Sequence, residues 1–201
     1  MLKLLNGIKI ALFLRILSFF SVRLATLAGM KPVEKDKLDQ LLTIIPDHPQ
    51  IRLLHFADSG IELPRMLNDF VTEKAYEYQL HCTDQAYFSY VERTLQSTPH
   101  TKARYFALTR PRYTIQGKLY DFVFVTADIE EQMREAFLQR VHPIIKNGGS
   151  IMLFVPKGDH TQRFAWMQLL EENYYVASNT IDDLFEHYDL LISRKMHGWG
   201  G

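Results

Sequence analysis

The sequence of 201 residues contains a single cysteine, Cys82. One cysteine excludes a disulfide within the chain, and it makes a reducing compartment, the cytoplasm, the expected location. The chain also has no excess of either charge, because 23 basic side chains balance 23 acidic ones. Proteins that bind nucleic acids depend largely on neutralising phosphates, so we expect no nucleic-acid partner.

Motifs that carry several common chemistries are missing as well. The sequence has no GxGxxG fingerprint of nicotinamide-binding domains, no lysine-containing phosphate loop and no GxSxG nucleophile elbow. Its eight histidines form no closely spaced ligand pair, so we expect no metal site. His55 and His81 lie in apolar segments, where we expect hydrogen-bonded core residues, and Cys82 should be a small buried hydrophobe.

Residues 1–30 are the most hydrophobic part of the chain, yet they lack a run long enough to cross a membrane. The uncharged stretches after Lys9 are no longer than Ile16–Val22, well short of the ~20 residues that a spanning helix needs. Arg15 lies inside the apolar run, which is not typical of a signal peptide. Two interpretations stay open: a helix on an anionic membrane surface, or one packed on the domain's own core or a second subunit. We favour packing, because the polar residues do not gather on one helical face.

Prolines mark the boundary between two parts of the chain. Pro46 and Pro49 bracket a linker, which predicts a helical N-terminal extension, residues 1–48, and a domain of residues 49–201. Within the extension, the spacing of apolar residues predicts a short helix over Glu34–Ile45.

Strands and helices are predicted to alternate from Ile51 onward. Asp121–Thr126 and Ser150–Pro156 are almost continuously apolar, as is typical of strands buried on both faces. The segment between them predicts a helix, with Asp128 as its N-cap and Gly148 or Gly149 at its end. The other predicted elements are strands Ile51–Ala57, Glu77–Cys82 and Arg104–Leu108, helices Ile61–Lys74, Gln85–Leu95 and Thr161–Glu172, and a last strand pair, Tyr174–Ser178 and Leu190–Ser193. This alternation predicts an α/β fold with a doubly wound, mostly parallel, seven-stranded Rossmann-like sheet.

Carboxylates follow three of the predicted strands. In a doubly wound sheet, ligands bind beyond the carboxyl ends of the strands, at the point where the strand order reverses. The candidate residues there are Asp58, Ser59 and Gly60 after the first strand, Asp84 after the second, Thr109 after the third, and Thr126 and Asp128 after the fourth. Asp84 and Asp128 also have a purely structural interpretation, since aspartate is common at strand ends and is a preferred helix cap.

The segment from Ile51 to Arg194 resembles the class I S-adenosylmethionine-dependent methyltransferases. The resemblance rests on the element order, the acid after the second strand, the YDFVFVTAD strand, the KNGG before the fifth strand and the last strand pair. It implies a sheet with an antiparallel last strand, S-adenosylmethionine as cofactor and a small-molecule substrate.

The resemblance also implies roles for individual residues. Asp58, Ser59 and Gly60 would approach the methionine part of the cofactor, Asp84 would hold the ribose hydroxyls, Thr109 would approach the adenine, and Thr126 to Asp128 would face the substrate. The glycine-rich first loop of the family is degenerate here, because only Gly60 remains. Side chains at Phe56 and Asp58 would hinder the close backbone approach that glycine permits.

Methyl transfer needs positioning more than a protein nucleophile. If the acceptor is a hydroxyl or an amine, a base assists, and Asp128 or His160 is the candidate. The alternative from another class is a non-catalytic protein with a methyltransferase fold, which serves as a membrane-surface or protein-interaction module.

Overall fold

The computed structural model describes residues 29–196, apart from residues 97, 115 and 116. The predictions made for the first 28 residues therefore lie outside the described part of the chain. Among the residues that are described, no helix has the length and apolar character needed to cross a bilayer. The same residues contain no cluster of three histidine, cysteine, aspartate or glutamate side chains suited to a metal ion.

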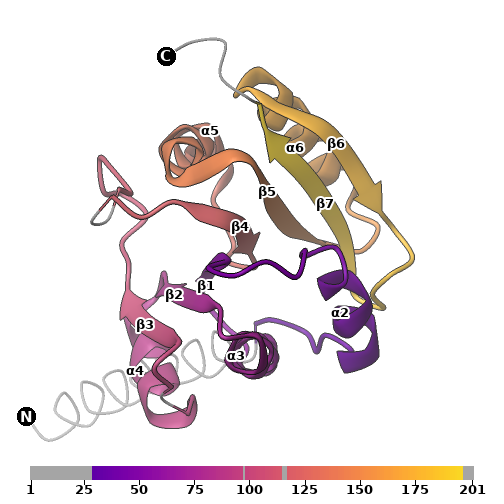
Figure 1. The fold of residues 1–201 in the computed structure, drawn as a ribbon. Coiled ribbons are helices and arrows are strands. Elements are labelled where there is room, and N and C mark those ends of the chain that lie inside the picture. Colours follow the sequence, from indigo (N-terminus) through magenta and orange to yellow (C-terminus); the bar gives the residue numbers. More distant parts are fainter. Residues whose placement is uncertain (1–28, 97, 115–116, 197–201) are drawn as a thin grey trace, which may run out of the picture.

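Helices and strands alternate along most of the chain (Figure 1). The helices are α2 (Lys35–Leu42), α3 (Glu62–Lys74), α4 (Gln85–Thr94), α5 (Glu131–Val141), the 3-10 turn η1 (His142–Ile144) and α6 (His160–Glu172). The strands are β1 (Arg52–Ala57), β2 (Glu77–Cys82), β3 (Thr101–Tyr105), β4 (Tyr120–Val125), β5 (Ile145–Pro156), β6 (Tyr175–Ile181) and β7 (Tyr188–Lys195).

The strands form one seven-stranded sheet in the order β3-β2-β1-β4-β5-β7-β6. The first five strands in this order pair in parallel, whereas β7 runs antiparallel to both β5 and β6. The strand order reverses between β1 and β4, so the switch point lies beyond the carboxyl ends of these two strands. The predicted doubly wound, mostly parallel sheet is confirmed.

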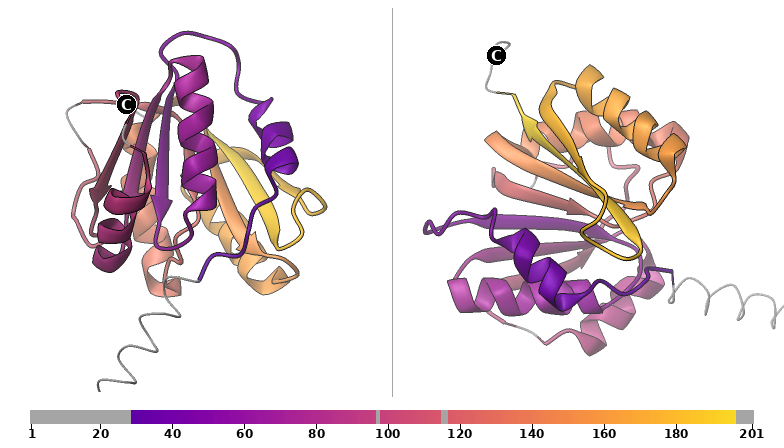
Figure 2. Two further views of the ribbon diagram at one scale, coloured as in Figure 1. Left: turned by 90° about the horizontal axis from the view of Figure 1, so that it is seen from below. Right: turned by 90° about the vertical axis from the view of Figure 1, so that its right-hand side faces the viewer.

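Helices cover both faces of the sheet (Figure 2). On one face α2, α3 and α4 pack on a hydrophobic cluster that includes Leu53, Leu80 and Phe124. On the other face α5 and α6 pack on a second cluster, which includes Phe56 and Val123. The leucines of α2 are buried in the first cluster, so the short predicted helix contributes directly to the core. The domain division at residue 48 stays a prediction.

The third strand lies three residues earlier than predicted. Thr101 pairs with Tyr78 and Tyr105 with Cys82, so β3 ends at Tyr105. The apolar residues beyond it belong to the following loop, where Phe106 is fully buried by packing. The predicted strand Arg104–Leu108 was therefore wrong in position, because burial in a loop and burial in a strand give the same apolar pattern.

Both predicted ends of the helix after β4 were wrong. The N-cap of α5 is Glu130 and not Asp128, and its side chain makes no capping hydrogen bond. The helix ends at Val141, ahead of Pro143, which has no N–H to continue the helical hydrogen bonds. Gly148 lies in β5, with a φ of 76°, at an irregularity in the pairing of β5 with β4.

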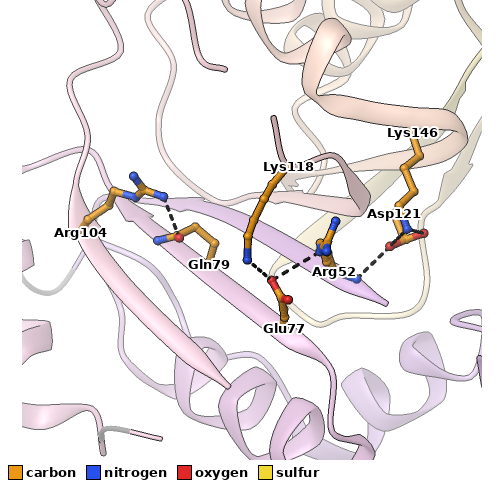
Figure 3. Close-up of polar contacts among 7 residues, drawn as sticks. All are labelled: Arg52, Glu77, Gln79, Arg104, Lys118, Asp121 and Lys146. Atoms are coloured by element: carbon orange, nitrogen blue, oxygen red, sulfur yellow. Dashed lines mark hydrogen bonds and ion pairs between the residues drawn. The ribbon is translucent and has the colours of Figure 1, made fainter. Parts of the chain in front are cut away.

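A network of polar side-chain contacts lies toward the amino ends of the parallel strands (Figure 3). Glu77 accepts a hydrogen bond of 2.6 Å from Lys118 and lies 3.4 Å from Arg52 Nε. Asp121 accepts from Lys146 Nζ at 2.8 Å and from the Arg52 backbone N–H at 2.8 Å. The hydrogen bond from Lys118 is the main cause that lowers the pKa of Glu77 below its usual value. Acids and bases at this end of the sheet thus neutralise one another.

Candidate functional site

A cavity of about 420 Å³ opens at the carboxyl ends of β1, β4 and β5. Its wall brings together four residues predicted from the sequence, Asp58, Ser59, Thr126 and Asp128. The start of β7 also reaches this end of the sheet, because Tyr188 pairs with Pro156 at the end of the antiparallel β5. The cavity therefore lies at the switch point where a doubly wound sheet binds its ligands.

Two carboxylates face the cavity, and none of the described residues in its wall is a lysine or an arginine. Asp58 accepts hydrogen bonds of 2.7 Å from the Ser59 hydroxyl and of 2.7 Å from the Asp128 backbone N–H. Within the described part of the chain, neither Asp58 nor Asp128 forms an ion pair. A cationic ligand would complement two such carboxylates.

A buried hydrogen-bond chain leads from the core to the cavity. His55, in the middle of β1, is fully buried. Its Nε2 lies 2.8 Å from the Thr126 hydroxyl, and its Nδ1 lies 2.9 Å from the Tyr78 hydroxyl. Burial lowers the pKa of His55 to about 3, so the imidazole is neutral at physiological pH. The prediction of a hydrogen-bonded core histidine is confirmed for His55.

Aromatic side chains also contribute to the wall of the cavity. Phe154, Trp166 and Tyr188 all line the cavity, and they come from β5, α6 and β7. The guanidinium of the buried Arg134 lies over the Trp166 ring, 5.2 Å from its centroid, and its Nε donates to the backbone oxygen of Ile129. Aromatic faces attract cations, so the aromatic wall complements the two carboxylates.

The segment Gly29–Glu34, which we call the strap, closes the space above the first loop. A Cβ at Gly60 would lie only 2.9 Å from Met30 Cβ, and Gly60 has a φ of 72°. The Tyr188 hydroxyl fixes the strap, because it accepts from the Lys31 N–H at 2.7 Å and donates to the Lys31 oxygen at 3.2 Å. The Tyr87 hydroxyl donates to the Gly60 oxygen from below. The one glycine left in the loop thus accommodates the strap.

The remaining predicted site residues do not line the cavity. Asp84 caps α4, since its carboxylate accepts a hydrogen bond of 2.7 Å from the Tyr87 N–H. Thr109 is exposed in the loop beyond β3. His160 is exposed at the start of α6, where its Nδ1 accepts from Arg163 at 3.0 Å. Their predicted roles in cofactor binding and catalysis stay predictions.

Two side chains near the first loop differ from expectation. Phe56 does not reach into the cavity, because it is fully buried among Phe106, Tyr113 and Phe137. His81 is buried as expected, but its ring nitrogens have no hydrogen-bond partner within the described residues, and the ring stacks on Phe106 at 4.2 Å. The expectation of a hydrogen-bonded core residue was therefore wrong for His81.

Sequence reasoning missed the strap and the aromatic wall. Trp166 carries an ordinary packing signal, since it is a buried aromatic residue of α6, and only the tertiary fold makes it a wall residue. Met30 belongs to a segment more than 25 residues before Gly60, and no local pattern predicts that the two residues meet. Tyr188 follows a loop, and nothing in the sequence links its hydroxyl to Lys31.

No family model matches the chain, and no curated protein matches it. Solved structures of methyltransferases do match. A SAM-dependent O-methyltransferase from Thermotoga maritima aligns with a TM-score of 0.66 and 9% identity, over 86% of this chain and 69% of that chain. A TehB-like SAM-dependent methyltransferase from Corynebacterium glutamicum aligns with a TM-score of 0.59 and 12% identity, over 90% and 96%.

Larger enzymes contain the same unit. The CurJ carbon methyltransferase aligns with a TM-score of 0.58 and 13% identity, over 80% of this chain, and the chain spans 52% of that protein. Sequence identities this low indicate a shared backbone fold and not a shared chemistry. Together with the strand order β3-β2-β1-β4-β5-β7-β6, the comparisons show that this chain has a class I methyltransferase-like fold.

Proposed function

We propose that the chain is an S-adenosylmethionine-dependent methyltransferase that acts on a small-molecule acceptor. One observation carries the proposal: the cavity at the switch point combines three aromatic side chains with two carboxylates, Asp58 and Asp128, that form no ion pair with any described residue. A sulfonium or an ammonium group suits such a wall, through charge attraction and cation–π contact. The O-methyltransferase and the TehB-like enzyme that share this fold are both described as SAM-dependent, which supports the choice of cofactor.

The residues of the wall fit this cofactor in size and charge. A volume of about 420 Å³ lies in the range of pockets that hold small ligands. Asp58 and Ser59 would hold the ammonium end, and Asp84, whose Oδ2 has no hydrogen-bond partner within the described residues, would bind the ribose from the rim. When bound, the cofactor supplies a methyl group that is electrophilic because it is attached to a sulfonium.

The chain's own residues would then orient the acceptor and accept its proton. Asp128 is the better placed of the two predicted bases, because it lies on the cavity wall and the structure gives its carboxylate no hydrogen bond within the described part of the chain. His160 would take part only if the acceptor extended toward the start of α6. The aromatic wall would exclude water from the reacting groups.

Isothermal titration calorimetry of the full chain with S-adenosylmethionine and S-adenosylhomocysteine tests the proposal. We expect micromolar to submillimolar binding, weakened at least tenfold by Asp58→Asn. Asp69→Asn, which changes an exposed acid on α3, is the matched control and should bind like the unmodified protein. The absence of binding at millimolar ligand would remove the proposal.

A second candidate function is a non-catalytic protein that has kept the sheet. The strap favours it, because Met30 occupies the space over the first loop, and so does the use of Asp84 as a helix cap. This candidate predicts no cofactor binding in the unmodified protein. Cofactor binding that is abolished by Asp84→Ala and by Asp58→Asn would count against it.

Residues 1–30 would supply a contact with a membrane surface or a second subunit in either case. The proposal rests on the five basic side chains among the first 31 residues and on the strap that connects this segment to the cavity. Flotation of the full chain with vesicles containing anionic lipids, beside a variant that starts at Gly29, tests the membrane contact. Equal amounts of both proteins in the unbound fraction would reject it.

A further inference from the structure

The His55 imidazole is a buried polar group in a strand whose other buried residues are apolar. It lies beside the Thr126 hydroxyl, and Thr126 forms part of the cavity wall. Burial of a polar side chain is unfavourable unless its polar atoms are hydrogen-bonded. Both ring nitrogens are hydrogen-bonded here, so the remaining question is which group donates in each contact.

The number of available hydrogens decides the direction of each hydrogen bond. The Phe56 backbone oxygen, 3.4 Å from the Thr126 hydroxyl, can accept the hydroxyl hydrogen, so Oγ1 can in turn accept from His55 Nε2–H. Nδ1 then carries no hydrogen and accepts from the Tyr78 hydroxyl. In the opposite tautomer, the buried Tyr78 hydroxyl would have no acceptor within the described residues. A buried donor without an acceptor is unfavourable, so the Nε2–H tautomer is assigned.

This arrangement fixes what Thr126 offers to the cavity. A hydroxyl oxygen has two lone pairs, of which one accepts from His55 and the other is available to a ligand. Asp58 and Asp128 on the same wall are carboxylates, which also accept when ionised. The polar groups at the carboxyl ends of β1 and β4 therefore form a set of acceptors, which suits a ligand that carries N–H or O–H donors.

We propose that His55 is a positioning residue that holds the Thr126 hydroxyl as an acceptor for an ammonium, amine or hydroxyl group of the bound ligand. This inference rests on the proposed function and deepens it, because it states the chemistry of the group beside β4. His55 itself does not touch the ligand, since it is fully buried behind Thr126. Its effect on binding should therefore operate entirely through the Thr126 hydroxyl.

Calorimetry with S-adenosylhomocysteine on four variants of the full chain tests the inference. Thr126→Val, which removes the hydroxyl at nearly constant volume, should weaken binding about threefold to tenfold, the equivalent of one hydrogen bond. Thr126→Ser should recover most of that loss. His55→Phe should weaken binding to a similar extent, and adding it to Thr126→Val should produce little further loss.

A matched control separates this effect from a general loss of a buried hydrogen bond. Ser193→Ala removes the 2.7 Å contact between the Ser178 and Ser193 hydroxyls on the last two strands, away from the cavity. It should leave the affinity unchanged. If His55→Phe does not fold, the Thr126 variants still decide whether the hydroxyl binds ligand. Nitrogen-15 NMR of histidine in the unmodified protein decides the second point, because His55 should show the neutral Nε2–H tautomer.

The outcomes distinguish the inference from the function on which it rests. S-adenosylhomocysteine binding that is unchanged by Thr126→Val would overturn the inference and leave the proposed function in place. An Nδ1–H tautomer, or losses from His55→Phe and Thr126→Val that add in full, would also overturn it. No binding by the unmodified protein would overturn both proposals.

Discussion

The acidic side chains at the two ends of the sheet have different partners. At the amino end, Glu77 and Asp121 form ion pairs with Lys118 and Lys146 (Figure 3). At the carboxyl end, Asp58 is held by a hydroxyl and a backbone N–H, and no cation pairs with it within the described residues. The acids at the amino end are neutralised by the protein itself. Asp58 and Asp128 at the carboxyl end have no such cation among the described residues, and the proposed site for a cationic ligand depends on this difference.

The two ends of the sheet also differ in which atoms surround a glycine. At Gly60, on the carboxyl side, the obstacle to a side chain is Met30 of the strap. At Gly149, on the amino side, a Cβ would lie 2.8 Å from the backbone oxygen of Asp121. A side chain from another segment can be removed by substitution, whereas a strand carbonyl cannot. The carboxyl end is therefore the end whose enclosure can be altered.

The largest expected effect is that of Gly60→Ala. We expect a loss of about 3 kcal/mol in the free energy of unfolding, because the left-handed backbone costs ~1–2 kcal/mol and overpacking against Met30 ~1–3 kcal/mol. Urea unfolding followed by circular dichroism measures the change. In a Met30→Gly background the same substitution should cost less, since only the backbone term remains.

Gly149→Ala is the comparison for Gly60→Ala, and it is also measured with and without Met30→Gly. It should destabilise the protein by about 1–3 kcal/mol through overpacking, and Met30→Gly should not reduce that cost. If Gly60→Ala cost the same with and without the Met30 side chain, the strap would not be what encloses the first loop.

The next largest effect follows from removing the charge of one acid, and it is compared between an acid at each end of the sheet. Asp58→Asn should weaken S-adenosylhomocysteine binding about tenfold, or ~1.4 kcal/mol, because the carboxylate charge is lost while an acceptor for the Asp128 N–H is kept. Asp121→Asn should leave the affinity unchanged and lower stability by about 1 kcal/mol or less, since Lys146 loses its partner. Equal effects of both substitutions on affinity would remove the distinction between the two ends.

Asp84 tests whether one carboxylate at the carboxyl end serves two purposes. Asp84→Ala should cost about 1 kcal/mol of stability through loss of the α4 cap, whereas Asp84→Asn should retain the cap. Both variants should weaken cofactor binding if the second oxygen holds the ribose. Thermal unfolding and calorimetry on the same samples separate the two roles. Unchanged affinity in both variants would leave Asp84 as a helix cap alone.

Elements with strong local signals could be predicted from the sequence. The bounds of β2 agree with the prediction, and those of β1 and α3 differ by one residue, because apolar residues at strand or helix spacing, with turn residues between the elements, give clear signals. β3 could not be placed correctly, since its residues Thr101–Tyr105 are mostly polar and the apolar Phe106 lies beyond it. Apolar character alone does not place a residue in the core either, since Phe164 of α6 is 70% exposed.

The candidate site was predictable only in its strand-end residues. Asp58, Ser59, Thr126 and Asp128 follow strands whose order the alternation pattern gives, so the sequence places them at one edge. The strap, the aromatic wall and the link from His55 to Thr126 join segments far apart in the chain. Contacts of this kind depend on tertiary packing, for which a single sequence has no local signal.

The smallest expected effect is the pH dependence contributed by Glu77, at the amino end. The hydrogen bond from Lys118 holds the folded-state pKa of Glu77 below its ordinary value. A lowered folded pKa means that the stabilisation is fully present above the unfolded pKa and is lost as the pH falls through the folded value. Glu77→Gln should therefore lower stability slightly at pH 6 and flatten its decline below pH ~4.5.

The Glu77 side chain is 49% exposed, so solvent and salt screen its ion pair with Lys118, and 0.5 M salt should reduce the difference in stability between the two proteins. Urea midpoints from pH 3 to 6 measure it. If the stability of Glu77→Gln declined equally steeply with falling pH, other carboxylates would control acid stability. The polar contacts at the amino ends of the strands would then not keep their charges paired in solution.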